Sequence, residues 1–161
     1  MNAIGGYDIE DLMVGMSSRF TKTLSEQEVL LFAGASGDTN PVHLNEEYAK
    51  QTPFGGRIAH GMLSAAVISA AIAGRLPGPG SIYVSQRLNF RRPVRLGETV
   101  CANITVKEVL ARQRRVVLET VCEVNGRVVV DGDAVVLVTS LAQRSGARPA
   151  VSGEEPRRSQ A

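Results

Sequence analysis

An uncharged stretch from Gly61 to Ala73 constrains the fold more than any other part of this sequence. Its residues are small or apolar on every side, and a helix that is apolar all round is expected to be buried. The stretch is too short to cross a bilayer, which takes about 20 residues, and Ser64 and Ser69 interrupt it. Gly74 suits the C-terminal end of such a helix. We therefore expect one buried central helix with the rest of the chain packed around it.

The second half of the chain has the residue types and the alternation of β-strands. β-branched side chains recur in four segments, and short turn-forming segments separate them. Asn125-Gly126 lies between the last two segments, and Asn-Gly between two strand patterns is the strongest short signal of a β-hairpin. The sequence therefore predicts four long antiparallel strands, at residues 82–90, 99–109, 115–124 and 128–141.

The first half predicts shorter elements. Residues 17–23 alternate weakly and predict a short strand. Ser25 has a Glu three residues later, which is the pattern of a capping box, and it starts a helix predicted at 25–34. Residues 35–44 are rich in turn formers and predict a loop, after which Asn45 can cap a short helix. Helices followed by an antiparallel sheet indicate the α+β class, with one sheet wrapped over one helix.

The chain of 161 residues is long enough for one domain and short for two. We assign this domain to residues 1–141 and expect residues 142–161, which are polar and rich in Gly, Pro, Ser and Arg, to form a disordered tail. The tail holds all of the net charge of +2, so the domain itself is neutral. A neutral domain argues against binding to duplex nucleic acid. An aromatic content of 4% without Trp argues against a stacking platform for single strands.

The cysteine and histidine content limits the chemistry further. Cys101 and Cys122 have no CxxC spacing, and we expect both to be reduced thiols in the core, which suits a cytoplasmic protein. A count of 2 His excludes a His-rich metal site, so neither a metal nor a cofactor is expected. Residues 1–15 carry acidic side chains and no apolar segment, so we expect no signal peptide and no membrane contact.

The segment Ser36-Gly-Asp-Thr-Asn-Pro-Val-His43 holds a carboxylate and an imidazole on a turn-rich backbone. Gly37 permits a tight turn and Pro41 stiffens it, which brings Asp38 and His43 together. Such a pair can activate a water and return a proton without a metal or a nucleophile. Asp and Asn before a short helix are also ordinary turn and capping residues, and a lone His can bond the backbone. The pattern alone leaves both interpretations open.

A second segment, Arg57-Ile-Ala-His60-Gly61, lies where the predicted central helix starts. The first N–H groups of a helix lack partners within the helix, and the helix dipole is positive at that end. A glycine there lets a substrate carbonyl approach the backbone, so the N–H of Gly61 is a candidate oxyanion-hole donor. The alternative is that His60 and Gly61 simply begin a helix that packs tightly under the sheet.

Taken together, the two segments resemble the (R)-specific enoyl-CoA hydratases, which are also called MaoC-like or hydratase-2 dehydratases. The resemblance rests on the Gly-Asp-x-Asn-Pro-x-His string that ends at His43 and on the downstream Ile-Ala-His60-Gly61-Met-Leu. It extends over about residues 8–141, including Leu88-Asn-Phe90 and the following Pro93-Val94 and Gly97-Glu98. It implies a hot-dog fold, in which an antiparallel sheet wraps a long central helix, and it implies a homodimer.

The resemblance also implies an activity and the residues that carry it. The expected reaction is the reversible hydration of a trans-2-enoyl-CoA to the (R)-3-hydroxyacyl-CoA, with CoA as part of the substrate rather than a cofactor. Asp38 and His43 take the place of the family's catalytic pair, and the backbone N–H of Gly61 that of its oxyanion donor. Asn40 is expected to hold the loop or the water. We assign the base to Asp38 and the protonation of C2 to His43.

Helical spacing suggests where an acyl chain would lie beyond Gly61. Ala65, Ile68, Ser69 and Ile72 follow at i+4, i+7, i+8 and i+11, on roughly one helix face, and are candidates for the pocket wall. The alternative is that all four pack under the sheet. The candidates for binding the CoA phosphates are four arginines, Arg87, Arg91, Arg92 and Arg95. The alternative is that these arginines simply lie on a solvated strand face and turn.

Two rival functions fit the same fold class. A hot-dog thioesterase often uses a carboxylate on the central helix, but residues 62–73 contain neither Asp nor Glu. A non-catalytic acyl-CoA-binding protein needs no acid/base pair, and the presence of Asp38 and His43 counts against it. The chain length of the acyl group and the pathway stay open, with polyhydroxyalkanoate monomer supply, fatty-acid oxidation and a dehydratase step in synthesis all compatible with the sequence.

Overall fold

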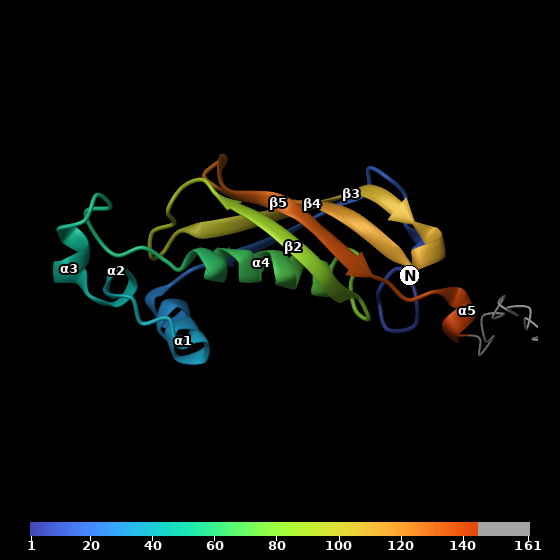
Figure 1. Ribbon diagram of the computed structural model, residues 1–161, viewed down its shortest axis with the longest axis horizontal. Coiled ribbons are helices and arrows are strands. Elements are labelled where there is room, and N and C mark those ends of the chain that lie inside the picture. Colours follow the sequence, from blue (N-terminus) through green and yellow to red (C-terminus); the bar gives the residue numbers. More distant parts are fainter. Residues whose placement is uncertain (145–161) are drawn as a thin grey trace, which may run out of the picture.

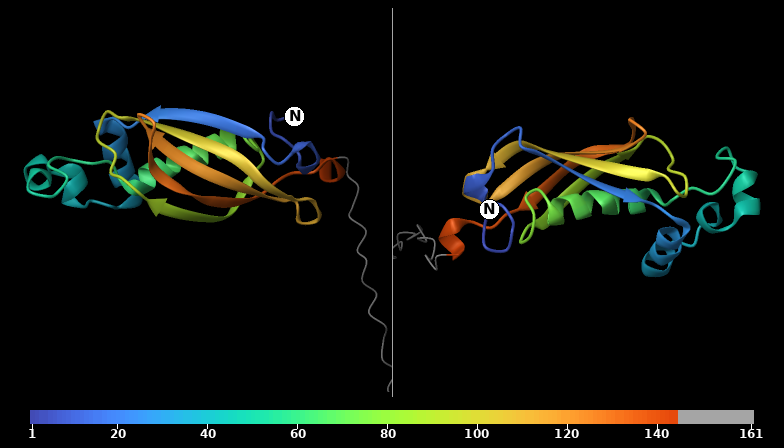
Figure 2. Two further views of the ribbon diagram at one scale, coloured as in Figure 1. Left: turned by 90° about the horizontal axis from the view of Figure 1, so that it is seen from above. Right: turned by 180° about the vertical axis from the view of Figure 1, so that it is seen from behind.

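A five-stranded antiparallel sheet curves over one helix, α4 (Gly61–Gly74), in the computed structural model, which describes residues 1–144 (Figure 1). The strands run in the order β1-β3-β4-β5-β2, so that β1 and β2 form the two edges. Their bounds are β1 (Ser17–Thr23), β2 (Ile82–Phe90), β3 (Thr99–Leu110), β4 (Arg115–Val124) and β5 (Arg127–Leu137). The views from above and behind show α4 lying along the inner face of the sheet (Figure 2). The predicted α+β class and hot-dog arrangement are confirmed.

Local sequence signals explain most of these elements. Ser25 and Glu28 form the predicted capping box at the start of α1 (Glu26–Ser36). Asn125 and Gly126 both have positive φ, 49° and 73°, as the tight Asn-Gly turn between β4 and β5 requires. β5 ends earlier than predicted, because residues 138–140 leave the ladder before the short helix α5 (Leu141–Arg144). The rest of the predicted tail, residues 145–161, lies outside the described residues.

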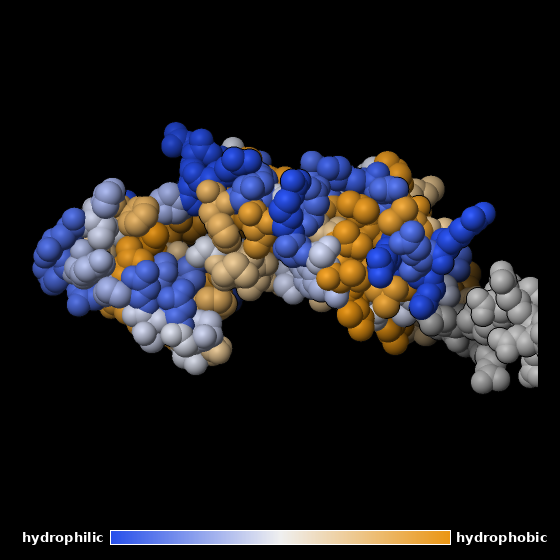
Figure 3. All heavy atoms as spheres, viewed as in Figure 1, coloured by the Kyte–Doolittle hydropathy of each residue, from blue (hydrophilic) through white to orange (hydrophobic). Residues whose placement is uncertain are grey.

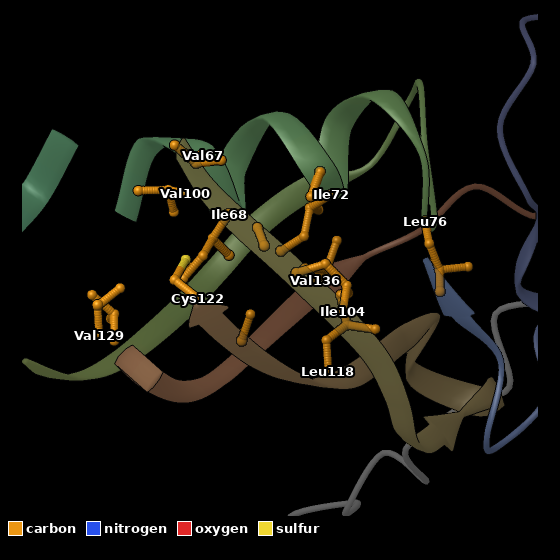
Figure 4. Packing of buried hydrophobic residues seen from close by; sticks show 14 of the residues in the cluster. Val67, Ile68, Ile72, Leu76, Val100, Ile104, Leu118, Cys122, Val129 and Val136 are labelled. Carbon is orange, nitrogen blue, oxygen red and sulfur yellow. The ribbon is translucent and has the colours of Figure 1, made fainter. Parts of the chain in front are cut away.

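The hydrophobic core lies between α4 and the concave face of the sheet (Figure 4). Ile68 and Ile72 point from α4 into this layer and are 0% and 2% exposed. They pack in one cluster with Ile104, Leu118 and Val136 from the sheet. Fully burying a side chain of this size contributes about 1.5–3 kcal/mol, so this layer fixes the position of α4 under the strands.

The opposite face of α4 is exposed, which corrects the expectation of a helix buried on all sides. Met62 is 55% exposed, and Ala66, Ser69, Ala70 and Ala73 are exposed as well. The edge strand β2 continues this surface with three exposed apolar side chains, Ile82, Tyr83 and Val84. Hydrophobic residues gather on the molecular surface where β2 begins (Figure 3). A contiguous exposed apolar surface of this kind is typical of a site that contacts another molecule.

Three short helices extend beyond the end of the sheet (Figure 1). They are α1, α2 (Pro41–Leu44) and α3 (Glu46–Lys50). The predicted cap of α3 is confirmed, since Asn45 Oδ1 accepts a hydrogen bond from the N–H of Tyr48 at 3.0 Å. The predicted loop at 35–44 is wrong in part, because residues 41–44 form the single turn α2. This extension carries the first of the two motifs.

Among residues 1–144, no helix combines the length and the apolar character that crossing a membrane would take. Cys101 and Cys122 are buried and free. Cys122 lies in the hydrophobic core cluster, as predicted, whereas Cys101 is buried outside this cluster, where its Sγ accepts a hydrogen bond from Arg19 Nε at 2.7 Å.

Candidate active site

The loop that carries Asp38 follows from the way α1 ends. Gly37 has φ 77°, a left-handed conformation that glycine adopts without steric strain, and its N–H donates to Ala33 O at 2.9 Å. The chain turns sharply there. Asp38 N–H then donates to Ser36 Oγ at 3.1 Å, and Asp38 Oδ1 accepts from Asn40 N–H at 3.2 Å. The carboxylate is thereby held on an exposed loop with one oxygen free of any hydrogen bond within the described chain.

The helix α2 places His43. Asn40 caps this helix, with Oδ1 accepting from Val42 N–H at 3.2 Å, and Pro41 occupies the first helical position. His43 is 8% exposed, and its Nδ1 lies 2.8 Å from Ile58 O. A carbonyl oxygen only accepts, so Nδ1 carries a hydrogen, and Nε2 is left to face a water or a substrate. Asn40 therefore holds the loop, one of the two roles predicted for it.

His60 joins the first motif to the second. It is the residue before α4 and is 1% exposed. Its Nε2 lies 2.9 Å from Asp38 O, and its ring centroid lies 3.9 Å from that of His43. The sequence analysis treated His60 only as part of the start of a helix and missed this contact. Its signal was the His-Gly pair placed at the first turn of the buried helix, opposite an Asp-containing loop.

Asp38, His43 and His60 form one cluster. A carboxylate oxygen of Asp38 and one ring nitrogen of each histidine lie within 4.8 Å of one another. Tetrahedral zinc, with bonds of about 2.0–2.1 Å, needs its ligand atoms about 3.4 Å apart. One nitrogen of each histidine bonds a backbone carbonyl, and the two ring planes are tilted by 33° with their centroids 3.9 Å apart. The cluster suits an acid/base pair better than a metal site.

A pocket of about 290 Å³ opens beside this cluster. Both His43 and Gly61 line it, so the imidazole and the start of α4 face one space. The backbone N–H of Gly61 is at the first position of α4 and makes no hydrogen bond within residues 1–144. A donor without a partner at the positive end of a helix is what an oxyanion hole needs. Other residues around the pocket include Ser64, Phe90, Arg91 and Arg92.

The four candidate acyl-wall residues separate into two pairs. Ala65 and Ser69 line a second hollow of about 280 Å³ between α4 and β2, together with Tyr83 and Leu88. Ile68 and Ile72 instead point into the core, as the helical twist turns them toward the sheet. Partial burial raises the pKa of Tyr83 to about 12, so its hydroxyl stays neutral beside Ser69. The acyl-binding role of all four residues stays a prediction.

The candidate phosphate-binding arginines also separate. Arg87 and Arg91 are engaged in ion pairs with Asp133 and Asp131 on the outer face of the sheet. Lys107 and Arg87 lower the pKa of Asp133, and Arg91 lowers that of Asp131.

Arg91 and Arg92 both line the pocket, whereas Arg95 contacts it only through Phe54. Arg92 donates to Val128 O at 2.7 Å and forms no ion pair within the described residues. Arg95 donates to the carbonyl oxygen of Phe54, which also lines the pocket. Of the four arginines, Arg92 therefore combines a place in the pocket with an unneutralised charge.

Comparison with known proteins gives a consistent result. A family model described as a MaoC like domain matches residues 13–127. An (R)-specific enoyl-CoA hydratase of Rhodospirillum rubrum is 53% identical over 129 residues, which cover 80% of this chain and 90% of the relative. A 3-hydroxybutyryl-CoA dehydratase of Methylorubrum extorquens is 49% identical over 129 residues, covering 80% of this chain and 82% of the relative.

A solved structure agrees with these sequence comparisons. The unliganded R-hydratase PhaJ1 of Pseudomonas aeruginosa matches with a TM-score of 0.80 and 46% identity, over 84% of this chain and 87% of that chain. The resemblance drawn from the two motifs is confirmed.

Proposed function

The chain belongs to the MaoC-like domain family, and on that premise we propose that it catalyses the reversible hydration of trans-2-enoyl-CoA to (R)-3-hydroxyacyl-CoA. The observation that carries the proposal is the meeting of Asp38 and His43 beside a pocket that also exposes Gly61. Relatives about 50% identical to the chain are named as an enoyl-CoA hydratase and a hydroxybutyryl-CoA dehydratase, the two directions of this reaction.

The first step is binding of the thioester carbonyl to the N–H of Gly61. Negative charge grows on this oxygen as a hydroxyl group adds at C3, so a fixed donor stabilises the transition state more than the substrate. The dipole of α4 also stabilises this negative charge, because the positive end of the helix lies at Gly61. The remaining charge develops at C2, which then needs a proton.

Asp38 and His43 supply the two proton transfers. His43 enters the reaction as the imidazolium, with a hydrogen on each ring nitrogen. Asp38 accepts one hydrogen of the water as the water oxygen bonds to C3, and His43 gives the hydrogen on Nε2 to C2. Because Nδ1 of His43 stays bonded to Ile58 O, only Nε2 takes part, and the ring cannot turn away. The proton on Asp38 then returns to His43, so that one water is added and the pair is restored. Donor and acceptor on one side of the double bond suit syn addition.

The chain is proposed to act as a homodimer. The exposed face of α4 and the edge strand β2 form one apolar surface, and a second copy of the same surface would bury it. We place the enzyme in the cytoplasm, where the buried thiols of Cys101 and Cys122 stay reduced. Neither a metal nor a cofactor enters the proposed reaction, and nucleic acid and membranes are not among its partners.

The rival functions differ from this one in what they do to crotonyl-CoA. A hydratase removes the enoyl absorbance and releases no thiol, a thioesterase releases free CoA, and a binding protein does neither. We expect loss of absorbance without thiol release, and with (R)-3-hydroxybutyryl-CoA as product. Release of thiol at the rate of substrate loss, or no turnover at all, would overturn the proposed function.

A further inference from the structure

His60 holds Asp38 through the backbone rather than through its carboxylate. Its Nε2 lies 2.9 Å from Asp38 O, and because a carbonyl oxygen only accepts, Nε2 carries the hydrogen. The other ring nitrogen, Nδ1, is buried and has no hydrogen-bond partner within the described residues. The site therefore accommodates the tautomer protonated at Nε2. A second hydrogen, at Nδ1, would have no acceptor.

This one hydrogen bond ties the catalytic loop to the central helix. The other hydrogen bonds of residues 37–40 within the described chain all stay inside the segment from α1 to α2. Without the bond from His60, the loop has no polar tie to the start of α4, where Gly61 lies. The tie matters because Asp38 is on an exposed loop and the oxyanion donor is on a packed helix.

The ring of His60 also touches the second member of the catalytic pair. Its centroid lies 3.9 Å from that of His43 with 33° between the planes, and 4.9 Å from that of Phe32. His60 thus contacts the backbone of one catalytic residue and the ring of the other, and its own chain continues directly into Gly61. The backbone of Asp38, the ring of His43 and the start of α4 therefore meet at this side chain.

We infer that His60 is a positioning residue for the proposed hydration, and that its Nε2–H bond to Asp38 O sets the carboxylate at reacting distance from the water held at His43. The inference rests on the proposed function. His60 does not touch the reacting atoms and transfers no proton. A misplacement of about 1 Å at a catalytic group lowers turnover by about 10²-fold.

Replacements that separate the donor from the ring test this inference. His60→Gln keeps an N–H donor at nearly the reach of Nε2 but loses the ring, whereas His60→Phe keeps the ring and loses the donor. His60→Asn has a side chain too short for its amide to reach Asp38 O. It serves as a second variant without the donor to Asp38 O if His60→Phe fails to fold. Val67→Ala, in α4 and 3% exposed, is the control for loss of stability alone.

The measurements are kcat and KM for crotonyl-CoA, the pH profile of kcat, and Tm. We expect His60→Phe and His60→Asn to lower kcat about 10²-fold with KM within about threefold of wild type. His60→Gln should stay within about tenfold of wild type and keep both limbs of the pH profile. Val67→Ala should lower Tm and leave kcat unchanged. In a variant that already carries Asp38→Asn, His60→Phe should lower kcat little further, because both changes disable the carboxylate of Asp38.

Three results would overturn the inference: donor-free variants that keep more than a third of wild-type kcat, a His60→Gln variant as inactive as they are, or a limb of the pH profile lost in His60→Gln. The last result would make His60 an acid/base group itself. Failure of the proposed function is a separate outcome, since the wild-type protein would then not hydrate crotonyl-CoA at all.

Discussion

The ring of Phe90 lies so close to Gly61 that a Cβ built on this glycine would come within 2.9 Å of the ring atoms Cδ1 and Cε1. Phe90 is the last residue of β2, is 54% exposed, and lines the same pocket as His43. The missing side chain of Gly61 makes room for this aromatic ring, directly beside the N–H that is the oxyanion donor in the proposed reaction.

The double-mutant cycle of Gly61→Ala and Phe90→Ala tests whether the close approach of Phe90 is what requires glycine at position 61. Gly61→Ala alone should lower kcat/KM and Tm, because the new methyl group pushes the ring of Phe90 away. Removing the ring as well should restore part of both values, since the backbone N–H is still present. Coupling between touching residues amounts to about 0.5–3 kcal/mol. Additive effects on kcat/KM and on Tm would show that the close approach of Phe90 is not what requires glycine.

Local signals predicted the fold where a few neighbouring residues decide the structure. The capping box at Ser25, the Asn125-Gly126 hairpin and the strand at 17–23 all depend on adjacent residues, and the structure has each of them. The Asp38 and His43 motif was also readable from sequence. The single-turn helix α2 was not, because Asn40 and Pro41 favour turns and helix starts equally.

The placement of α4 required information that the sequence of the helix does not contain. A helix that is apolar on all sides has no polar face to show which side meets the sheet. The structure buries Ile68 and Ile72 and exposes Ala66 and Ser69. The His-Gly pair marks His60 in the sequence, but its contact with Asp38 does not follow from that signal, because the contact depends on how a loop and the start of a helix meet in space.

The exposed face of α4 and strand β2 predicts the oligomeric state. We expect light scattering to give twice the mass of the chain, and deletion of residues 143–161 to change neither this ratio nor the activity. Val84→Lys places a charge on the edge strand β2, where Val84 is 45% exposed, and should shift the protein toward a monomer. Val14→Lys, at a 67% exposed position outside this surface, is the matched control. A wild-type monomer would contradict the proposed dimer.

Two substitutions on α4 test which surface receives the acyl chain. Ala65→Leu fills the hollow between α4 and β2, so we expect the ratio of kcat/KM for C8 over C4 enoyl-CoA to fall about tenfold. Ile72→Ala should instead lower stability by about 2–5 kcal/mol and leave the ratio unchanged, because Ile72 is 2% exposed and packs in the core. A raised ratio in Ile72→Ala would put this residue in the acyl wall, as the sequence spacing predicts. An unchanged ratio in Ala65→Leu would remove the hollow from the site.

The thiol of Cys122 should resist alkylation in the folded protein. Burial raises its pKa to about 12, whereas a cysteine in an unfolded chain has a pKa of about 8.5. At pH 8.5 the folded protein therefore carries almost no thiolate at Cys122, while about half of the unfolded chains do. Unfolding becomes more favourable as the pH rises above about 9, because only the unfolded thiol ionises there.

The Cys101→Ser variant isolates this thiol for measurement. Iodoacetamide labelling followed by mass spectrometry should be slow in buffer and fast in urea. Rapid labelling of the folded variant at pH 8.5 would show that Cys122 is not buried as the structure has it.

The account depends most directly on the turnover of Asp38 and His43 variants with crotonyl-CoA. Asp38→Asn and His43→Ala should each fold and should each lower kcat by about 10²–10⁴-fold, the range that general acid/base groups contribute. The double variant should be scarcely less active than either single variant, because the two groups act as a unit. An Asp38→Asn protein that keeps more than a tenth of wild-type turnover would contradict the assignment of Asp38, and with it the proposed mechanism.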